Sequence, residues 1–564
     1  MIDLKNEVAS LISSSVEALD LDTVYGLLEY PPDEKLGDVS LPCFKLSKTM
    51  RKAPPAIAAE LSSAIDITSS VFERVEVVGG YLNFFISHAE FAKSVISDVI
   101  SSENYGSSAM GNGKTVVFDY SSPNIAKPLH IGHLPSTVLG NSLYRIYSYL
   151  GYNTVGVNHL GDWGTQFGTM IVAYKKWGSR EEVEKGGVKE LVRLYVKFHK
   201  EEENDPTLRD QARATFAALE SGDKEAYELW SWFRDLSIAE CKRIYDILGV
   251  EFDHYTGESF YEDKMMPVVD ELRQKNILVE SDGAQIVDLS AYDMPPCIIL
   301  KSDGGTIYAT RDLAAILYRK KTFDFDKCIY LTATQQNLHF KQVFKVTELM
   351  GYEWAKNLIH APFGMISLAT GESMSTRSGV TIWLEDVINQ ATAKTLEIIK
   401  EKNPNMENKE TIAKQMGVGA VVFSSLSTSR IKDVSFSWED ALNFDGETGP
   451  YVQYTHARAC SVLRKAEGTA YNITKFTEDA EYRVARVLYD FPAKIVAAME
   501  NNEPSVITRY IIDLSREFNR FYHDCQINTE DEEIKQTRLA ITLAVKNVLC
   551  KGLWLIGLEA PERV

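Results

Sequence analysis

The sequence predicts an α/β protein whose central domain holds a parallel sheet, between a small α+β module and a bundle of helices. Three observations predict this fold class. A buried-strand pattern, a helix pattern and a second strand pattern follow one another over residues 115–160, which is the unit of a parallel sheet. Residues 1–110 mix helix and strand patterns. Residues 436–564 are almost entirely helical in pattern.

Composition limits the class of protein further. The chain has 564 residues, a formal net charge of −19 and 45% hydrophobic residues, so we expect several domains with proper cores. The N-terminus lacks the pattern of a secretory signal, and no apolar run reaches about 18 residues, so we expect no membrane span and a cytoplasmic location. The seven cysteines are scattered without a C-x-x-C pair, which argues against structural zinc and against disulfides.

The N-terminal module, residues 1–110, has helical patterns on both sides of the β-rich run ERVEVVGGYLNFFIS. In that run Tyr81, Asn83 and Phe85 alternate and therefore share one face of a strand. The stretch SSENYGSSAMGNGK that follows is rich in Gly and Ser, which is typical of a linker.

The central domain, residues 111–435, begins with the run TVVFDYS, which predicts a buried strand. The turn SSPN follows, and then a helical pattern that includes LHIGHLPST. A second strand is predicted at NTVGVNHL. Charged helical patterns at about residues 170–250 predict an insertion, after which AQIVDLS, CIILKSDGG and KCIYLTAT are expected to return to the sheet. Amphipathic patterns in residues 436–564 predict the helical bundle, without a repeat of solenoid period.

The turn after the first strand leads to a helix N-terminus, where backbone N–H groups and the helix dipole favour an anion. A helix there would put His130 and His133 on one face, so both could donate to one phosphate. Gly132 lacks a Cβ and lets a flat ring approach, and Lys127 adds positive charge. These groups favour electrostatic stabilisation of a phosphoryl centre. Two histidines at a helix start are more often simply exposed to solvent. Here the preceding strand and turn, Gly132 and Lys127 all favour a phosphate-binding site.

Two other phosphate-binding patterns do not hold. The stretch SAMGNGKT resembles a P-loop, but Ser108 stands at its first glycine position and the stretch precedes the strand instead of following it. No G-x-G-x-x-G follows a predicted strand, which disfavours a dinucleotide-dependent oxidoreductase.

The motif HIGH after such a strand resembles the first signature of the class I aminoacyl-tRNA synthetases. The stretches SSPNIAKPLHIGHL and VNHLGDWGTQFG resemble the arginyl-tRNA synthetases in particular, and KLGDVSLPCF, FDGETGPYVQY and the closing APERV extend the likeness over nearly the whole chain. The resemblance implies a Rossmann-like catalytic domain at 111–435, an N-terminal module that touches the tRNA D-loop at 1–110, and an α-helical anticodon-binding domain at 436–564.

The second signature of the class, K-M-S-K-S in general form, corresponds here to ESMSTRSG. Ser373 and Thr376 stand where the class has lysines. The resemblance implies that Lys127 substitutes for them and acts with Arg377, while Mg2+ lies on the β- and γ-phosphates of ATP. It implies catalytic roles for Lys127, His130, Gly132, His133 and Arg377, and an ATP-binding loop of Met374, Ser375 and Thr376. No residue is assigned as a metal ligand.

An arginine side chain needs a carboxylate, a flat neighbour and hydrogen-bond acceptors. The sequence offers Tyr308 and Asp312 four apart, Gln336 with His339 at another strand end, and Glu258. Alone, Asp312 could equally be a first-turn helix carboxylate and Tyr308 a core aromatic. The resemblance implies that Tyr308, Asp312 and Gln336 hold the guanidinium. It also implies an arginine-binding role for two further residues, namely Asn124 near the α-amino or carboxylate group and Glu258.

Tyr451 and Tyr454 lie three apart at a helix start set by Pro450, so they could stack unpaired tRNA bases. The resemblance implies tRNA contacts for both. In the N-terminal module the strand face of Tyr81, Asn83 and Phe85 could pack onto the helices of the module or, as the resemblance implies, contact tRNA. Asn83 is the preferred contact because an amide is poorly placed in a core.

The sequence therefore predicts an arginine–tRNA ligase, a class I aminoacyl-tRNA synthetase. Such an enzyme activates L-arginine with ATP and transfers it to tRNA(Arg), and the resemblance implies that tRNA must bind before activation. We expect a monomer. The alternative is a non-catalytic tRNA-binding paralogue of a synthetase, which the missing loop lysines motivate. A relative specific for cysteine would need zinc ligands at the substrate, and no such cluster occurs.

Overall fold

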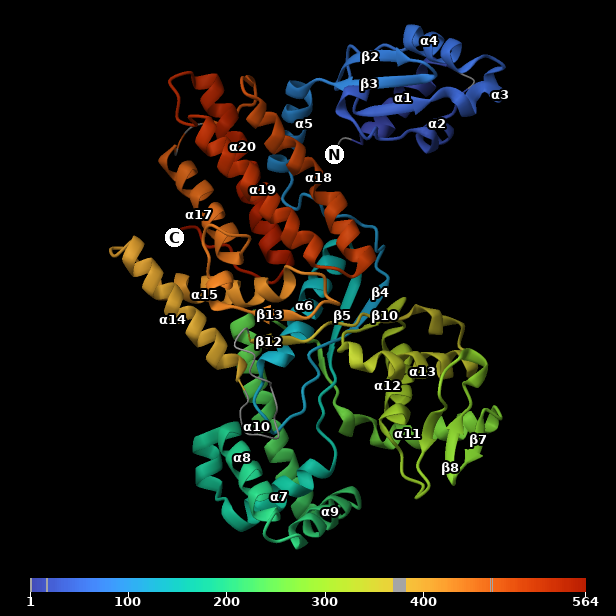
Figure 1. The fold of residues 1–564 in the computed structure, drawn as a ribbon, viewed down its shortest axis with the longest axis vertical. Helices are drawn as coiled ribbons and strands as arrows, with labels where there is room; N and C mark the ends of the chain where they lie inside the picture. The colour runs from blue at the N-terminus through green and yellow to red at the C-terminus, as the bar shows by residue number, and fades with distance from the viewer. Residues whose placement is uncertain (1–2, 17–18, 369–381, 467, 469) are drawn as a thin grey trace. The chain divides into compact units, whose positions relative to one another are not determined.

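The computed structural model describes residues 3–16, 19–368, 382–466, 468 and 470–564 (Figure 1). The chain forms two compact units. The first unit contains residues 1–105, 458–492 and 513–549. The second unit contains residues 106–457, 493–512 and 550–564.

The N-terminal part of the first unit is an α+β fold around a three-stranded antiparallel sheet in the order β1–β3–β2. Glycines 79 and 80 join β2 and β3, and Gly79 has a φ of 60°, which suits a tight turn. The predicted α+β module is confirmed. Its elements are α1 (Leu4–Ser15), α2 (Leu21–Leu27), η1 (Glu34–Leu36), β1 (Val39–Pro42), η2 (Cys43–Leu46), α3 (Ser47–Met50), α4 (Pro54–Ala64), β2 (Phe72–Val78), β3 (Tyr81–Ile86) and α5 (His88–Ser101).

Four long helices follow one another in the C-terminal part of the chain, as the sequence predicts. The buried faces of these helices are apolar. Phe518 and Phe521 are fully buried, so they belong to the bundle core. The helices are α17 (Gly449–Lys465), α18 (Asp479–Asn501), α19 (Ser505–Asp524) and α20 (Glu532–Leu555).

A five-stranded sheet forms the centre of the second unit, and all its pairings are parallel. The strand order is β11–β10–β4–β5–β6, and α6 (Leu134–Tyr149) makes the crossover from β4 to β5. The predicted parallel α/β class is confirmed. The strands are β4 (Thr115–Asp119), β5 (Asn153–Asn158), β6 (His254–Tyr255), β10 (Lys327–Tyr330) and β11 (Leu358–His360).

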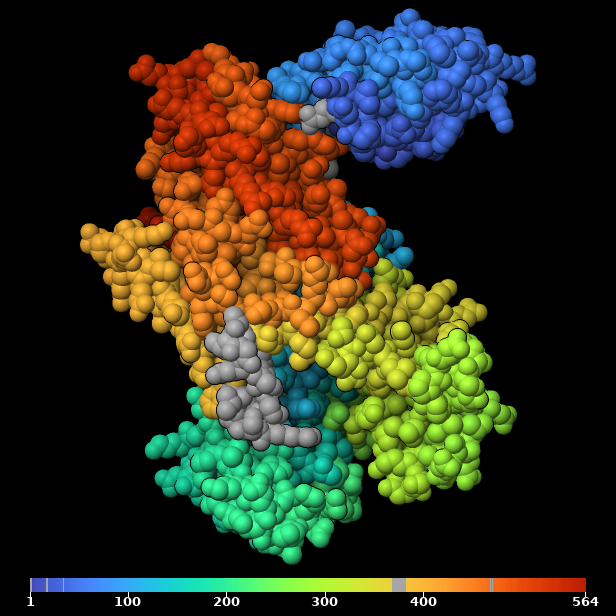
Figure 2. All heavy atoms as spheres, viewed as in Figure 1, coloured from blue at the N-terminus to red at the C-terminus, as the bar shows by residue number. Residues whose placement is uncertain are grey.

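The predicted insertion is also present, as four helices between β5 and β6. Their own apolar core includes Trp230, Phe198 and Phe233. In Figure 2 the atoms of this insertion form one lobe, and those of α11 (Glu262–Gln274) with the three-stranded sheet of residues 278–300 form another, with a hollow between them. The insertion helices are α7 (Thr165–Trp177), α8 (Arg180–Glu202), α9 (Thr207–Glu220) and α10 (Lys224–Leu248).

One part of the strand prediction is wrong. AQIVDLS and CIILKSDGG do not join the parallel sheet but form β8 (Ala284–Val287) and β9 (Cys297–Leu300). Strand β8 pairs antiparallel with both β7 (Leu278–Ser281) and β9. The physical reason is the short turn at residues 282–283 between β7 and β8, since parallel neighbours need a crossover of about a dozen residues. Only KCIYLTAT, as β10, returns to the main sheet.

Among the described residues no helix is both long and apolar enough to cross a bilayer.

The second unit contains further helices and strands besides those named above. These elements are η3 (Ile131–His133), η4 (Glu258–Tyr261), η5 (Ser290–Tyr292), α12 (Tyr308–Phe323), η6 (Thr334–Gln336), α13 (Asn337–Leu349), η7 (Glu353–Asn357), β12 (Ile366–Leu368), α14 (Leu384–Lys402), α15 (Lys409–Leu426), β13 (Val434–Phe436) and α16 (Trp438–Ala441).

A buried ion pair stabilises the helices of the first unit. The Arg538 guanidinium donates from Nε to Glu481 Oε1 at 2.8 Å, and the Glu481 side chain has no exposed surface. The other carboxylate oxygen of Glu481 accepts the backbone N–H groups of Thr477 and Glu478.

Replacing Glu481 with Gln should therefore lower the free energy of unfolding by about 3–5 kcal/mol, because Arg538 would keep a buried charge without a counter-charge. Urea denaturation measures this change. As a control, Glu184→Gln breaks the exposed Arg180–Glu184 pair, whose side chains are 73% and 55% exposed, and should cost less than about 1 kcal/mol. Equal losses in the two variants would contradict the stabilising role of the buried pair.

Candidate active site

A cavity of about 870 Å³ opens at the carboxyl ends of β4, β5 and β10. Open parallel sheets bind their ligands at this edge, because the loops after neighbouring strands converge there. Seven residues proposed from the sequence line this one cavity: Asn124, Gly132, His133, Glu258, Tyr308, Asp312 and Gln336.

The loop between β4 and the first signature has an unusual backbone. Ser121, Ser122 and Ala126 have positive φ angles of 67°, 46° and 63°, which L-residues rarely adopt. Among the hydrogen bonds that hold this loop, two come from backbone N–H groups and end on serine hydroxyls of neighbouring helices. Ser121 N–H donates to Ser136 Oγ at 2.9 Å, and Ala126 N–H donates to Ser237 Oγ at 3.0 Å. The loop is therefore fixed by α6 on one side and by α10 of the insertion on the other.

The histidines of the first signature meet, although not on one helix face as the sequence predicts. His130 is extended, with a φ of −109°, and forms the N-cap of the short helix η3. The i, i+3 argument fails because the helix starts only after His130. The two rings nevertheless lie 3.8 Å apart, between centroids.

Backbone hydrogen bonds define which nitrogen of each ring carries the proton. Gly132 N–H donates to His130 Nδ1 at 3.1 Å, and His130 N–H donates to His133 Nδ1 at 3.1 Å. An Nδ1 that accepts a hydrogen bond leaves the proton on Nε2. Burial lowers the pKa of His133 to about 3. Burial and the nearby Lys127 also lower the pKa of His130. Both imidazoles are therefore neutral Nε2–H donors near pH 7.

Gly132 has a specific steric role. A Cβ at this position would lie 2.8 Å from Cε1 of the His130 ring, closer than real Cβ contacts allow. Glycine is therefore needed for His130 to turn its ring back over the η3 backbone. The sequence predicts that Gly132 makes room for a flat ring, and the structure identifies a ring that needs this room as that of His130.

The segment that follows the second signature lies against the first signature. Ile131 N–H donates to the carbonyl of Ile382 at 3.2 Å, and Leu384 N–H donates to the carbonyl of Leu129 at 2.9 Å. Met374, Ser375, Thr376 and Arg377 themselves lie outside the described residues.

The proposed arginine pocket contains two carboxylates, and each has a nitrogen-bearing partner inside the protein. His339 Nε2 lies 2.5 Å from Asp312 Oδ2. Burial would raise the pKa of Asp312, but the hydrogen bond and charge of His339 lower it below its ordinary value overall. Arg311 lies 3.1 Å from Glu258 and 3.0 Å from Glu262.

Glu258 differs from Asp312 in its protonation. Burial raises the pKa of the Glu258 carboxyl to about 6, although Arg311 acts against this shift. Tyr308 is 63% exposed at the mouth of the cavity, and its ring lies edge-on to that of His339 at 5.3 Å. The cavity is therefore acidic on this side and presents a flat ring at its entrance.

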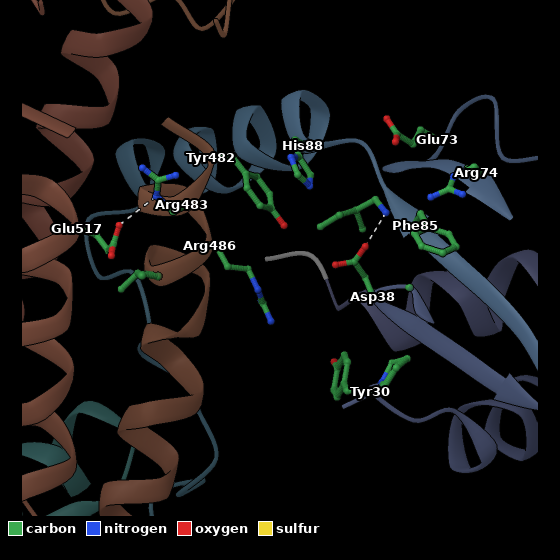
Figure 3. A pocket seen from close by; sticks show the side chains of 14 residues that line it. Tyr30, Asp38, Glu73, Arg74, Phe85, His88, Tyr482, Arg483, Arg486 and Glu517 are labelled. Atoms are coloured by element: carbon green, nitrogen blue, oxygen red, sulfur yellow. Dashed lines mark hydrogen bonds and ion pairs between the residues drawn. The ribbon is translucent and has the colours of Figure 1, made fainter. Parts of the chain in front are cut away.

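A second cavity, of about 490 Å³, lies in the first unit (Figure 3). The His88 and Tyr482 rings stack there at 3.6 Å, and Arg483 pairs with Glu517 at 3.4 Å. Its arginines are matched in number by acidic residues, so it has neither the acidic character that arginine needs nor an excess of cations for a triphosphate. The cavity at the parallel sheet is the better candidate.

Three models of known protein families match successive parts of the chain. Residues 95–438 match the sequence model described as "tRNA synthetases class I (R), catalytic domain", residues 452–564 the "DALR anticodon binding domain", and residues 4–86 the "Arginyl tRNA synthetase N terminal domain".

The chain belongs to the arginyl-tRNA synthetase family.

Relatives within this family are similar over their full length. The arginine–tRNA ligases of Alkaliphilus metalliredigens and Clostridioides difficile are 54% and 53% identical to the chain, with 100% of both chains covered in each case. The solved arginyl-tRNA synthetase of Thermus thermophilus is 26% identical, covers 100% of both chains and superposes with a TM-score of 0.82.

The residues proposed to contact tRNA differ in exposure. Tyr454 is 36% exposed and Tyr451 is partly buried, both in the first turns of α17. The preference for Asn83 is wrong as argued, because this side chain is only 3% exposed and its amide oxygen accepts the Ser40 hydroxyl at 2.6 Å. That hydrogen bond makes the amide stable in the module core. On the same strand face, Tyr81 is 40% exposed.

Sequence reasoning missed a buried polar network beside the arginyl-tRNA synthetase cavity. Arg319 is 1% exposed and lies 2.8 Å from Asp119 and 3.3 Å from His159 Nδ1. The Ser122 hydroxyl donates to the same Asp119 at 2.7 Å. No sequence pattern indicates a buried role for Arg319, because a charged helix residue usually faces solvent. Arg311 could have been found as a charged neighbour of Asp312.

The raised pKa of Glu258 predicts a pH dependence for arginine binding. Below about pH 6 the carboxylate becomes protonated and loses its attraction for a guanidinium, so the KM for arginine should rise as pH falls through 6, approaching about tenfold per unit. Steady-state kinetics between pH 5 and 8 measure this.

The KM for ATP serves as the internal control and should not follow the same curve. In Glu258→Gln the inflection near pH 6 should disappear and the KM for arginine should be high throughout. A wild-type KM for arginine that stays constant down to pH 5 would contradict this role.

Proposed function

We propose that this chain, an arginyl-tRNA synthetase by family, activates L-arginine with ATP and transfers the arginyl group to tRNA(Arg). The observation that carries the proposal is that one cavity holds both a signature imidazole that donates hydrogen bonds and two carboxylates suited to a guanidinium. The full-length similarity to arginine–tRNA ligases supports it and does not favour the non-catalytic paralogue.

In the first step the α-carboxylate of arginine attacks the α-phosphorus of ATP, and pyrophosphate leaves as arginyl-adenylate forms. The carboxylate is already an anion at neutral pH, so the step needs no general base. His130 and His133 donate from Nε2 to phosphate oxygens, where negative charge is concentrated. Lys127 and Arg377 supply positive charge, and Met374, Ser375 and Thr376 form the rest of the ATP-binding loop. Mg2+ enters with ATP as part of the substrate.

Recognition of arginine rests on Asp312 and Glu258, with Tyr308 as the flat neighbour. His339 occupies Oδ2 of Asp312, so Oδ1 remains for the substrate guanidinium. Arg311 holds Glu258 toward the cavity without filling it. Gln336 contributes an acceptor. Asn124 binds near the α-amino or carboxylate group, and its amide lies against Gly161, where any Cβ would overlap it.

In the second step a terminal ribose hydroxyl of tRNA attacks the arginyl carbonyl and AMP leaves. We assign residues 1–110 to the tRNA D-loop, residues 111–435 to catalysis, and residues 436–564 to the anticodon. Tyr451 and Tyr454 stack unpaired bases. In the N-terminal module the exposed Tyr81 replaces Asn83 as the proposed contact. The enzyme works as a monomer in the cytoplasm.

Arginine-dependent ATP–pyrophosphate exchange tests the activity. With tRNA(Arg) present, arginine should support exchange, whereas citrulline should not, because its neutral ureido group cannot pair with Asp312 and Glu258. Without tRNA(Arg), exchange should be absent, as the family resemblance implies. Exchange with another amino acid alone would refute the specificity, and no exchange at all with tRNA(Arg) and arginine would favour the paralogue.

Lys127→Ala should reduce exchange at least 100-fold, equivalent to about 2.7 kcal/mol, because this chain lacks both lysines of the second signature. The matched control is Lys197→Ala, another lysine of the second unit that lies over an aromatic ring, at 5.2 Å from the Trp177 centroid. It should keep nearly full activity. Equal activity of the two variants would show that Lys127 does not substitute for the missing lysines.

A further inference from the structure

The surroundings of Lys127 come from the helical insertion. Its Nζ lies 4.9 Å from the centroid of the Tyr195 ring on α8, within the range of a cation–π interaction. Burial lowers the pKa of the Lys127 ammonium, so this group is partly desolvated. Within the described part of the chain, no carboxylate forms an ion pair with Lys127.

An aromatic partner has a different effect from a carboxylate. A carboxylate would neutralise the ammonium and compete with phosphate for it. A ring face attracts the cation through its quadrupole but leaves the net positive charge in place. Tyr195 can therefore orient Lys127 while the charge stays available to an anion.

The backbone before Lys127 is held by the same insertion. Ala126 is in the left-handed region, and its N–H donates to Ser237 Oγ at 3.0 Å. Ser237 is 1% exposed, and its hydroxyl donates in turn to the carbonyl of Phe233 on α10. Helix α10 thus holds the backbone next to Lys127, and α8 contacts the ammonium at the end of its side chain.

The insertion also contacts the segment that follows the second signature. Glu385 pairs with Arg243 of α10 at 2.8 Å, and Lys189 of α8 lies 5.1 Å from the Trp383 ring centroid. Trp383 in turn forms a backbone bridge with His130. Helices α8 and α10 therefore contact both the first signature and the segment at residues 382–385 that follows the second signature.

We propose that Tyr195 is a positioning residue for Lys127, and that its ring holds the ammonium beside the first signature for the triphosphate of ATP. The proposal rests on the proposed function, in which Lys127 replaces the second-signature lysines. It gives the insertion a role in the chemistry, because α8 and α10 support the lysine that replaces the two lysines missing from the second-signature loop.

The test compares Tyr195→Leu with Tyr195→Phe in ATP–pyrophosphate exchange with tRNA(Arg) present. Leucine removes the ring, so kcat/KM for ATP should fall about 5- to 30-fold while the KM for arginine stays unchanged. Phenylalanine keeps the ring face and should restore activity to within about twofold of wild type. Failure of Phe to restore activity, or a loss confined to the KM for arginine, would overturn the proposal.

Trp177→Leu is the matched control, because it removes a ring of the same insertion that lies under Lys197, a lysine outside the proposed site. It should leave kcat/KM for ATP within about twofold of wild type, with thermal unfolding showing that each variant is folded. A loss equal to that of Tyr195→Leu would assign the effect to packing of the insertion and overturn the proposal.

A double-mutant cycle with Lys127→Ala separates this inference from the proposed function. In the Lys127→Ala background, Tyr195→Leu should have almost no further effect, because the cation it positions is gone. The same fold-loss in both backgrounds would overturn the role of Tyr195 alone. Full activity of Lys127→Ala would instead overturn the phosphate role of Lys127 in the proposed function.

Discussion

Two hydrogen bonds from backbone N–H groups to imidazole nitrogens organise the active site. Gly132 donates to His130 Nδ1, and His130 donates to His133 Nδ1. These bonds turn both rings back over η3, fix the protons on Nε2 and require a residue without a Cβ at position 132. Burial keeps both rings neutral, so the signature acts as a pair of oriented dipoles rather than as a pair of charges. The positive charge must then come from other residues, which makes the placement of Lys127 important.

The carboxylates proposed to bind the substrate amino acid already have partners inside the protein. Asp312 has His339 and Glu258 has Arg311, and the buried Asp119 has Arg319 beside it. Leaving such carboxylates unpaired in a partly buried cavity would cost several kcal/mol each, of the order seen when a buried pair is broken. The internal partners lower this cost while leaving carboxylate oxygens free. Arg311, Asp312 and Arg319 all come from α12, so one helix supplies much of the proposed recognition site.

The sequence alone predicts those elements of the fold whose pattern lies within one short stretch of the chain. The strand at residues 115–119, the crossover helix and the insertion follow from periodicity, and the catalytic motifs follow from their order along the chain. Long-range partners could not be predicted. The pairing of β8 with β7 depends on a hairpin turn, burial of Asn83 depends on Ser40, and the ring pair at His130 depends on where η3 starts. Arg319 and Tyr195 gave no pattern, because their partners lie far away in the chain.

The central claim is that the neutral imidazoles of His133, which lines the cavity at the parallel sheet, and of the adjacent His130 contact the triphosphate, beside carboxylates that contact guanidinium. A crystal structure of the chain with L-arginine and a non-hydrolysable ATP analogue tests it most directly. The account predicts phosphate oxygens within about 3 Å of the Nε2 atoms of His130 and His133, and the guanidinium within the same distance of Asp312 and Glu258. A nucleotide bound away from both histidines, or a guanidinium that contacts neither carboxylate, would contradict the account.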